Sequence, residues 1–160
     1  MTVTVFRRPE PDEVARVTTT AAELLEVVWG RASTAPTSAS QLRALYILEH
    51  HEGINLRTLT EGLASTPPST SRLCDRLHAA GFIEREASVE DRREVRLHLS
   101  NKGRAFLADL RIRREAELRK VLEDMPAAKR VALLEGLEAF CSTAAAQIQG
   151  DPLGIDSQTA

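Results

Sequence analysis

Hydroxyl and guanidinium side chains are concentrated in one short stretch of this 160-residue chain, between Thr66 and Arg76. A hydroxyl group donates hydrogen bonds to phosphate oxygens or base edges, and a guanidinium can form two parallel hydrogen bonds with guanine. Small side chains also let a helix approach the floor of the major groove. A second charged group follows at Glu90–Arg93. These residue types favour contact with duplex DNA.

The distribution of charge is compatible with an anionic partner, although the whole chain has a formal net charge of −2. Residues 66–120 contain 13 basic and 9 acidic side chains, a local charge of +4, whereas residues 121–160 contain 2 basic and 6 acidic side chains. A locally basic face on a mildly acidic body can still bind nucleic acid.

Catalytic and metal sites are poorly supported by the residues. Glu90 and Asp91 lie in a charged turn with no base, nucleophile or glycine-rich loop nearby, so no enzyme activity is predicted. His50 and His51 point about 100° apart on a helix, and no further histidine completes a metal site. We therefore expect neither a metal nor a cofactor.

The cysteines and the hydropathy indicate the compartment. Cys74 and Cys141 are 67 positions apart and outside any CxxC motif, so both are expected to be reduced thiols without a redox role. No apolar run approaches the roughly 18 to 20 residues that cross a bilayer, and the first residues carry charges and prolines where a signal peptide would be apolar. We expect a cytoplasmic protein with no membrane partner.

The elements that position the polar stretch are mostly helices. Aromatic residues make up only 4% of the chain, and Leu, Ala, Arg and Glu are abundant, which favours helix over strand. Caps are predicted at Ser38 (with Gln41), Asn55, Thr66 and Ser100. Periodicity and caps predict helices over residues 11–31, 39–50, 56–63, 67–80, 101–124 and 126–149, and strands over residues 82–87 and 95–99.

The helix over residues 67–80 has two different faces. Thr70, Leu73, Cys74, Leu77 and Ala80 form an apolar face, and Ser69, Arg72, Arg76 and Ala79 form a polar, basic one. The ordinary alternative for the second face is a solvated surface, but the short helix before it and the two strands after it make a helix-turn-helix with a wing. The predicted fold class is mainly α with a small two- or three-stranded β wing, a winged helix-turn-helix flanked by dimerisation helices.

Two motifs resemble the MarR family of bacterial transcriptional regulators, over about residues 12–148. LTEGLASTPPSTSRLCDRLHAAGFIERE resembles the helix-turn-helix of that family, and EDRREVRLHLSNKGR resembles its wing signature. The resemblance implies a homodimeric repressor or activator, of which we expect a repressor, bound to a palindromic operator on double-stranded DNA. It also implies a helical dimerisation region (12–36 and 104–149), a DNA-binding domain (37–103), an N-terminal extension (1–11) and a flexible tail (150–160).

By position, the resemblance assigns DNA contacts to Pro68, Ser69, Ser71, Arg72, Arg76, Asp91, Arg92 and Arg93. The residues up to Arg76 would face the major groove or its phosphates. Arg93 would enter the minor groove, oriented by Asp91, and Arg92 would contact a phosphate. Pro68 stands where the family often has Ser, and Ser65 stands where it usually has an apolar turn residue, which loosens the packing of the turn.

Three further expectations concern partners. Apolar residues of the first helix and of the last two helices exceed what one small winged helix can cover, which predicts a homodimer: Val14, Val17, Leu24, Val28, Leu118, Val121, Leu134, Leu137 and Ile148. The resemblance places a small aromatic or amphipathic anionic ligand where the loop before Ser38 and the start of the fifth helix converge. The alternative function is a winged-helix module that binds only protein, which would not need Arg93 with Asp91.

Overall fold

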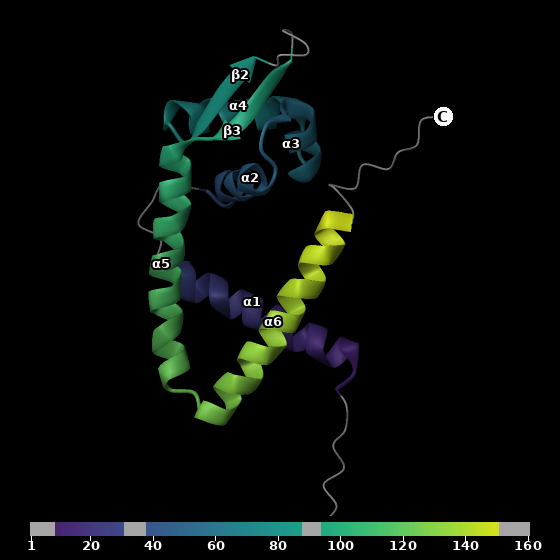
Figure 1. The fold of residues 1–160 in the computed structure, drawn as a ribbon, viewed down its shortest axis with the longest axis vertical. Helices are drawn as coiled ribbons and strands as arrows, with labels where there is room; N and C mark the ends of the chain where they lie inside the picture. The colour runs from purple at the N-terminus through teal and green to yellow at the C-terminus, as the bar shows by residue number, and fades with distance from the viewer. Residues whose placement is uncertain (1–8, 31–37, 88–93, 151–160) are drawn as a thin grey trace, which may run out of the picture.

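The predicted winged helix-turn-helix is confirmed by the computed structural model, which describes residues 9–30, 38–87 and 94–150 (Figure 1). Its helices are α1 (Pro11–Gly30), α2 (Ala39–His50), α3 (Leu56–Gly62), α4 (Pro67–Ala79), α5 (Asn101–Glu123) and α6 (Ala127–Gly150), and its strands are β1 (Ile54–Asn55), β2 (Ile83–Ala87) and β3 (Val95–Leu99). Each predicted element is present with small shifts at its ends, and β1 makes the sheet three-stranded.

The sheet has the order β1-β3-β2, with both pairings antiparallel. Leu97 of β3 pairs with Ile54 of β1 on one side and with Arg85 of β2 on the other. Leu97 and Leu99 are buried, so these two apolar side chains of the alternating pattern that predicted β3 do face a core. The two residues of β1 are too few for any periodicity to show.

Side-chain caps begin three of the helices as predicted. Gln41 N–H donates to Ser38 Oγ (3.3 Å) and Ser38 N–H donates to Gln41 Oε1 (2.8 Å), which completes a capping box before α2. Asn55 caps α3, and Ser100 caps α5. Thr66 stands at the N-cap of α4 but makes no side-chain cap bond, because its hydroxyl donates to the hydroxyl of Ser69 instead.

One core lies within the winged-helix lobe, which we define as α2 to β3 together with the first half of α5. Its largest fully buried side chains are Leu45, Leu48, Leu59, Leu77, Ile83 and Leu107. Ala80, predicted on the buried face of α4, is exposed because the helix ends at Ala79. None of the described side chains of α1 or α6 is buried. In the ranges that the structure describes, no helix is long and apolar enough to span a membrane.

The start of α5 fits closely against the base of the wing. Ser100 N–H donates to Phe82 O (3.0 Å), and Ser100 Oγ donates to Gly81 O (2.6 Å). A Cβ atom on Gly103 would lie 2.3 Å from Phe82 O and 2.7 Å from Leu99 Cδ1. The glycine of the wing motif is therefore required by close approach of α5 to the backbone at Phe82.

The first half of α5 is also held to α2 and to the turn after it by arginine side chains. Arg104 pairs with Glu52, and Arg111 pairs with Glu49 through both of its terminal nitrogens. The hydrogen bond from Arg111 is the main cause that lowers the pKa of Glu49 below its ordinary value.

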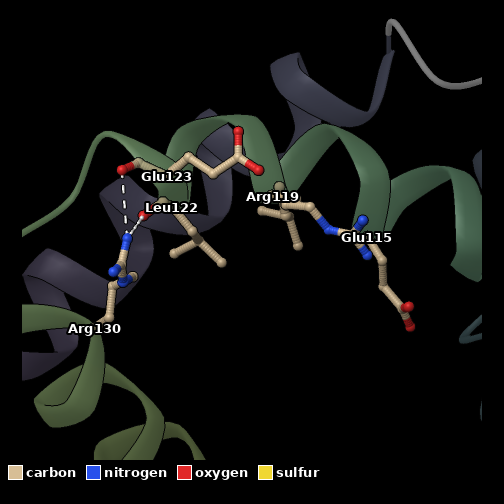
Figure 2. A pocket seen from close by; sticks show the side chains of 6 residues that line it. Glu115, Arg119, Leu122, Glu123 and Arg130 are labelled. Atoms are coloured by element: carbon tan, nitrogen blue, oxygen red, sulfur yellow. Dashed lines mark hydrogen bonds between the residues drawn. The ribbon is translucent and has the colours of Figure 1, made fainter. Parts of the chain in front are cut away.

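Beyond these contacts α5 continues away from the lobe, and α6 turns back from its end to form an open V (Figure 1). At the corner, Arg130 Nη1 donates to Leu122 O (3.1 Å) and Glu123 O (3.4 Å) and so satisfies the last carbonyls of α5 (Figure 2).

Candidate nucleic-acid interface

The polar face of α4 is presented to solvent. Pro68, Ser69, Arg72 and Arg76 are exposed, and Ser71 is half-buried, whereas Thr70, Leu73, Cys74 and Leu77 are buried. Ser69, Arg72 and Arg76 are three and four positions apart, so they share one face of the helix. Neither Arg72 nor Arg76 forms an ion pair with any residue in the described ranges. Two guanidinium groups on the polar face therefore keep their hydrogen-bonding capacity for a partner.

Contacts at both ends fix α4 in the lobe. At its start, Ser65 N–H donates to Thr60 O (3.1 Å), and Ala64 has a φ of 48°, a left-handed conformation that closes the turn after α3. At its end, Lys102 Nζ donates to Ala80 O (2.7 Å). Arg85 of β2 pairs with Asp75 of α4 (2.6 Å), which ties the helix to the wing.

The predicted wing-tip residues Asp91, Arg92 and Arg93 lie outside the described residues. The strands that carry the tip are well defined, with Ala87 pairing with Val95 at the last described position of the hairpin. The proposed interaction of Asp91 with Arg93 stays a prediction from the sequence.

A polar hollow lies beside the start of α4, and no pattern in the sequence predicted it. Its volume is about 400 Å³, and its polar wall consists of Ser38, Ser40, Arg43, Ser65, Ser69 and Arg76. We call it the serine–arginine hollow. Ser38 was identified only as a cap, and Ser40 and Arg43 carried no local signal, because the hollow is assembled from the starts of two helices that are about thirty residues apart in sequence.

A second space, here called the tryptophan cavity, lies between α1, α2 and α5. It has a volume of about 460 Å³ and is lined by Glu26, Trp29, Leu42, Arg43, Tyr46 and Arg114. The Arg114 guanidinium lies 4.5 Å from the centre of the Trp29 ring, and its Nη1 donates to Tyr46 Oη (3.0 Å). Trp29 Nε1 and Arg114 Nε are buried and have no hydrogen-bond partner within the described residues.

The tryptophan cavity differs in place from the predicted ligand site, which stays a prediction. The predicted ligand site involved the start of the fifth helix, but the cavity is lined by Arg114 from the middle of α5. At the start of α5, Ser100 and Gly103 pack directly on the base of the wing, whereas Asn101 and Arg104 line a separate hollow of about 520 Å³ beside β2 and β3. The loop before Ser38 lies outside the described residues.

The two cysteines differ in exposure. Cys74 is fully buried, and this burial raises the pKa of its thiol, which disfavours the reactive thiolate. Cys141 is exposed on α6. Across the described ranges, no three His, Cys, Asp or Glu side chains are grouped so that they could hold a metal ion.

Comparisons with known proteins agree with the geometry. Residues 37–95 match the sequence profile of the MarR family. The uncharacterized HTH-type transcriptional regulator YfiV of Bacillus subtilis is 29% identical over 100 residues, an alignment that spans 62% of this chain and 62% of YfiV. The crystal structure of RV1404 from Mycobacterium tuberculosis is 30% identical and superposes with a TM-score of 0.72, covering 86% of this chain and 97% of RV1404.

The transcriptional regulator Tm0710 from Thermotoga maritima has the same fold at 19% identity. Its TM-score is 0.74, and the superposition covers 86% of this chain and 98% of Tm0710. The matched residues 37–95 include α2, the helix-turn-helix and β2 of the wing, and the superpositions extend to the flanking helices. The chain therefore belongs to the MarR family and has its winged-helix fold.

Proposed function

We propose that the protein is a homodimeric repressor that binds a palindromic operator on double-stranded DNA and is released by a small ligand. The observation that carries the proposal is the exposed face of α4, on which Ser69, Arg72 and Arg76 have no acidic neighbour within hydrogen-bonding distance among the described residues. A helix with this face, followed by a wing, has the shape and the donors that fit a major groove.

Each predicted contact residue has a distinct role in this proposal. Pro68 and Ser69 are in the first turn of α4, the part of a recognition helix that approaches base edges. Arg72 forms two hydrogen bonds with guanine, and Arg76, a turn farther along, contacts the backbone. Ser71 is half-buried and contributes from the flank of the helix. In the wing, Arg93 enters the minor groove with Asp91 orienting it, and Arg92 contacts a phosphate.

Unpartnered apolar surface supports the homodimer. Val14, Val17, Leu24, Val121, Leu134 and Leu137 are each about half exposed or more. Val28 and Leu118 are half-buried, and the side chain of Ile148 lies outside the described residues. The open hollow at the α5–α6 corner adds Leu118 and Leu122 to this surface, beside the charged side chains of Glu115, Arg119, Glu123 and Arg130 (Figure 2). Surface of this kind is normally covered, and a second copy of the chain would cover it symmetrically.

The tryptophan cavity supports a ligand of small aromatic, anionic type. Its volume is within the range of about 300–1,000 Å³ that is common for small-molecule sites. Trp29 and Tyr46 offer ring faces, and the unpartnered Trp29 Nε1 and Arg114 Nε offer donors to an acidic group. The cavity lies between α1 and α5 on one side and α2 of the lobe on the other, so an occupant would alter how the lobe is held.

DNA binding is tested with the sequence upstream of the protein's own gene, by fluorescence anisotropy. We expect Arg72→Ala to weaken operator binding by about 1–3 kcal/mol and to remove the preference at one base pair in each half-site. Lys129→Ala, which removes an exposed charge on α6, is the control and should bind like the wild type. If Arg72→Ala weakens every sequence equally, Arg72 contacts a phosphate. If the wild type binds no DNA, the protein-interaction module becomes the better explanation.

The two wing residues are tested separately. Arg93→Ala should weaken binding strongly and lower the dependence of log K on log salt by about one unit, because one counterion-displacing cation is lost. Asp91→Ala should weaken binding less and leave that slope unchanged, since its role is to orient Arg93. The double variant should be far from additive. Additive effects, or tighter binding by Asp91→Ala, would show that Asp91 does not position Arg93.

A further inference from the structure

The serine–arginine hollow has the composition of an anion site. Four of its lining residues are serines (Ser38, Ser40, Ser65 and Ser69), two are arginines (Arg43 and Arg76), and no carboxylate lines it within the described residues. Its two formal positive charges are therefore not neutralised locally. Serine hydroxyls and guanidinium groups donate hydrogen bonds to tetrahedral oxyanions, and the planar guanidinium fits a phosphate through two donors at once.

The start of α2 adds backbone donors to the same hollow. The first amides of a helix have no carbonyl partner within the helix, and the aligned peptide dipoles make this end positive. Ser38 and Ser40, at the N-cap and second position of this 12-residue helix, both line the hollow. The start of α4 is a poorer source of amides because Pro67 and Pro68 have no N–H. The anion-binding helix end is thus that of α2.

A buried hydroxyl in the wall of the hollow gives an independent indication of a ligand. Thr70 lines the hollow, is only 1% exposed, and its Oγ1 has no hydrogen-bond partner in the described part of the chain. Buried hydroxyl groups are nearly always paired, because an unpaired one has lost its water without replacement. A bound oxyanion, or a water held by that anion, would supply the missing partner.

Arg43 is already oriented at the hollow. Its Nη2 donates to Gly62 O over 3.3 Å, which holds the guanidinium beside the end of α3. A guanidinium has five N–H donors, so this one long bond leaves most of them for another acceptor. Arg76 of α4 also lines the hollow and has no ion-pair partner among the described residues. The two guanidinium groups can therefore hold one anion between them.

We propose that the serine–arginine hollow binds a phosphate group. The proposal rests on the proposed function for its source, because Ser69 and Arg76 line the hollow and also belong to the exposed face of α4. When α4 lies in a major groove, the hollow is next to the strand that borders the groove, and its occupant is one backbone phosphodiester. The other source with the same chemistry is free phosphate.

The test uses the full-length protein and three variants. Arg43→Gln removes a charge from the hollow, Ser40→Ala removes a hydroxyl, and Arg43→Lys restores the charge without the planar fork. Lys129→Gln on α6 is the matched control for loss of one charge. Thermal melts establish that each variant is folded before binding is measured.

In the DNA arm, affinity is measured against the upstream operator and an unrelated duplex at several salt concentrations. Arg43→Gln should weaken both duplexes by a similar factor of about ten and lower the salt slope by about one unit, with no change in base preference. Arg43→Lys should restore the slope, and Ser40→Ala should weaken binding without altering it. Operators with single methylphosphonate linkages should reveal one position per half-site that weakens the wild type but not Arg43→Gln.

In the second arm, inorganic phosphate is titrated without DNA, with sodium chloride at equal ionic strength as the reference. Free phosphate is the occupant if two results are found together. Phosphate raises the melting temperature of the wild type and of Lys129→Gln but not of Arg43→Gln, and Arg43→Gln binds DNA as tightly as the wild type. The proposal is overturned if Arg43→Gln and Ser40→Ala match the wild type in both arms.

The two arms also separate this proposal from the proposed function. If Arg72→Ala loses base preference while the hollow variants bind normally, the DNA-binding function stands and the phosphate site fails. The opposite result is a wild type that binds no duplex but is stabilised by phosphate, with the stabilisation absent in Arg43→Gln. In that case the phosphate site stands and the DNA-binding function fails.

Discussion

Replacement of Gly103 by alanine provides a sharp test of the packing between α5 and the wing. The new Cβ atom would be 2.3 Å from Phe82 O, a backbone atom, and 2.7 Å from Leu99 Cδ1, whose side chain is 3% exposed. Because neither neighbour can rotate away freely, the backbone must shift. The same shift stretches the hydrogen bond from Ser100 N–H to Phe82 O, which measures 3.0 Å in the native chain.

The magnitude follows from three opposing contributions. Overpacking of a filled core destabilises by about 1–3 kcal/mol. Weakening of one backbone hydrogen bond adds about 0.5–1.5 kcal/mol. The higher helix propensity of alanine offsets this by about 1 kcal/mol. We expect Gly103→Ala to lower the free energy of unfolding by about 0.5–3.5 kcal/mol. The melting temperature should fall by roughly 2–4 °C for each kcal/mol in a chain of this size.

The assay is urea and thermal unfolding followed by circular dichroism at one protein concentration, because the proposed dimerisation would make stability concentration-dependent. Gly136→Ala in α6 is the control, since nothing lies within 4 Å of its Cβ position. Gly136 is also about 200° around the helix from Leu134. We expect this second substitution to stabilise the protein by about 0.5–1 kcal/mol. A Gly103→Ala protein as stable as the wild type would refute the packing argument.

Three further outcomes follow from the structure. Ala64→Gly should stabilise the protein by about 0.5–1 kcal/mol in urea unfolding, because φ at Ala64 is 48° and the left-handed strain exceeds the entropy cost of glycine. The hydrogen bond from Arg111 lowers the pKa of folded Glu49, so the pair stabilises the protein at pH above the ordinary glutamate pKa. This stabilisation is lost as the pH falls through the lowered pKa. The difference in unfolding free energy between wild type and Glu49→Gln, about 0.2–1 kcal/mol at pH 7, should therefore vanish in acid. Leu134→Asp should convert the dimer to monomer by light scattering, since Leu134 is 59% exposed in the single chain, and a monomeric wild type at micromolar concentration would contradict the dimer proposal.

The sequence predicted the elements whose signals are local. Ser38 with Gln41, and Ser100 before its helix, cap through contacts three residues apart, so the pattern along the chain contains both partners. The two faces of α4 were predicted in the same way from the spacing of Leu73, Leu77 and their neighbours. Local rules failed at Thr66, where the competing hydroxyl of Ser69 took the hydrogen bond.

Features that depend on distant segments were not predictable by the same reasoning. Strand β1 is two residues long and exists because β3, some forty residues later, pairs with it. The serine–arginine hollow brings Arg43 to Arg76, and the tryptophan cavity brings Trp29 to Arg114. No periodicity along one helix predicts that these residues lie close together in the fold. The wing residues Asp91, Arg92 and Arg93 stay predictions from the resemblance, because they lie outside the described residues.

The arginine contacts along α5 make its first half part of the winged-helix lobe. Arg111 and Arg114 contact α2 and Arg104 contacts Glu52 in the turn after it, so the lobe and α5 tilt together as one lever. The 23-residue helix is about 34 Å long, and a tilt of about 5° at its free end would displace the opposite end by about 3 Å. This displacement is close to the rise of one base pair, roughly 3.4 Å. In a dimer joined through α1 and α6, residues that never approach DNA would thus set the operator spacing that the two α4 helices can reach.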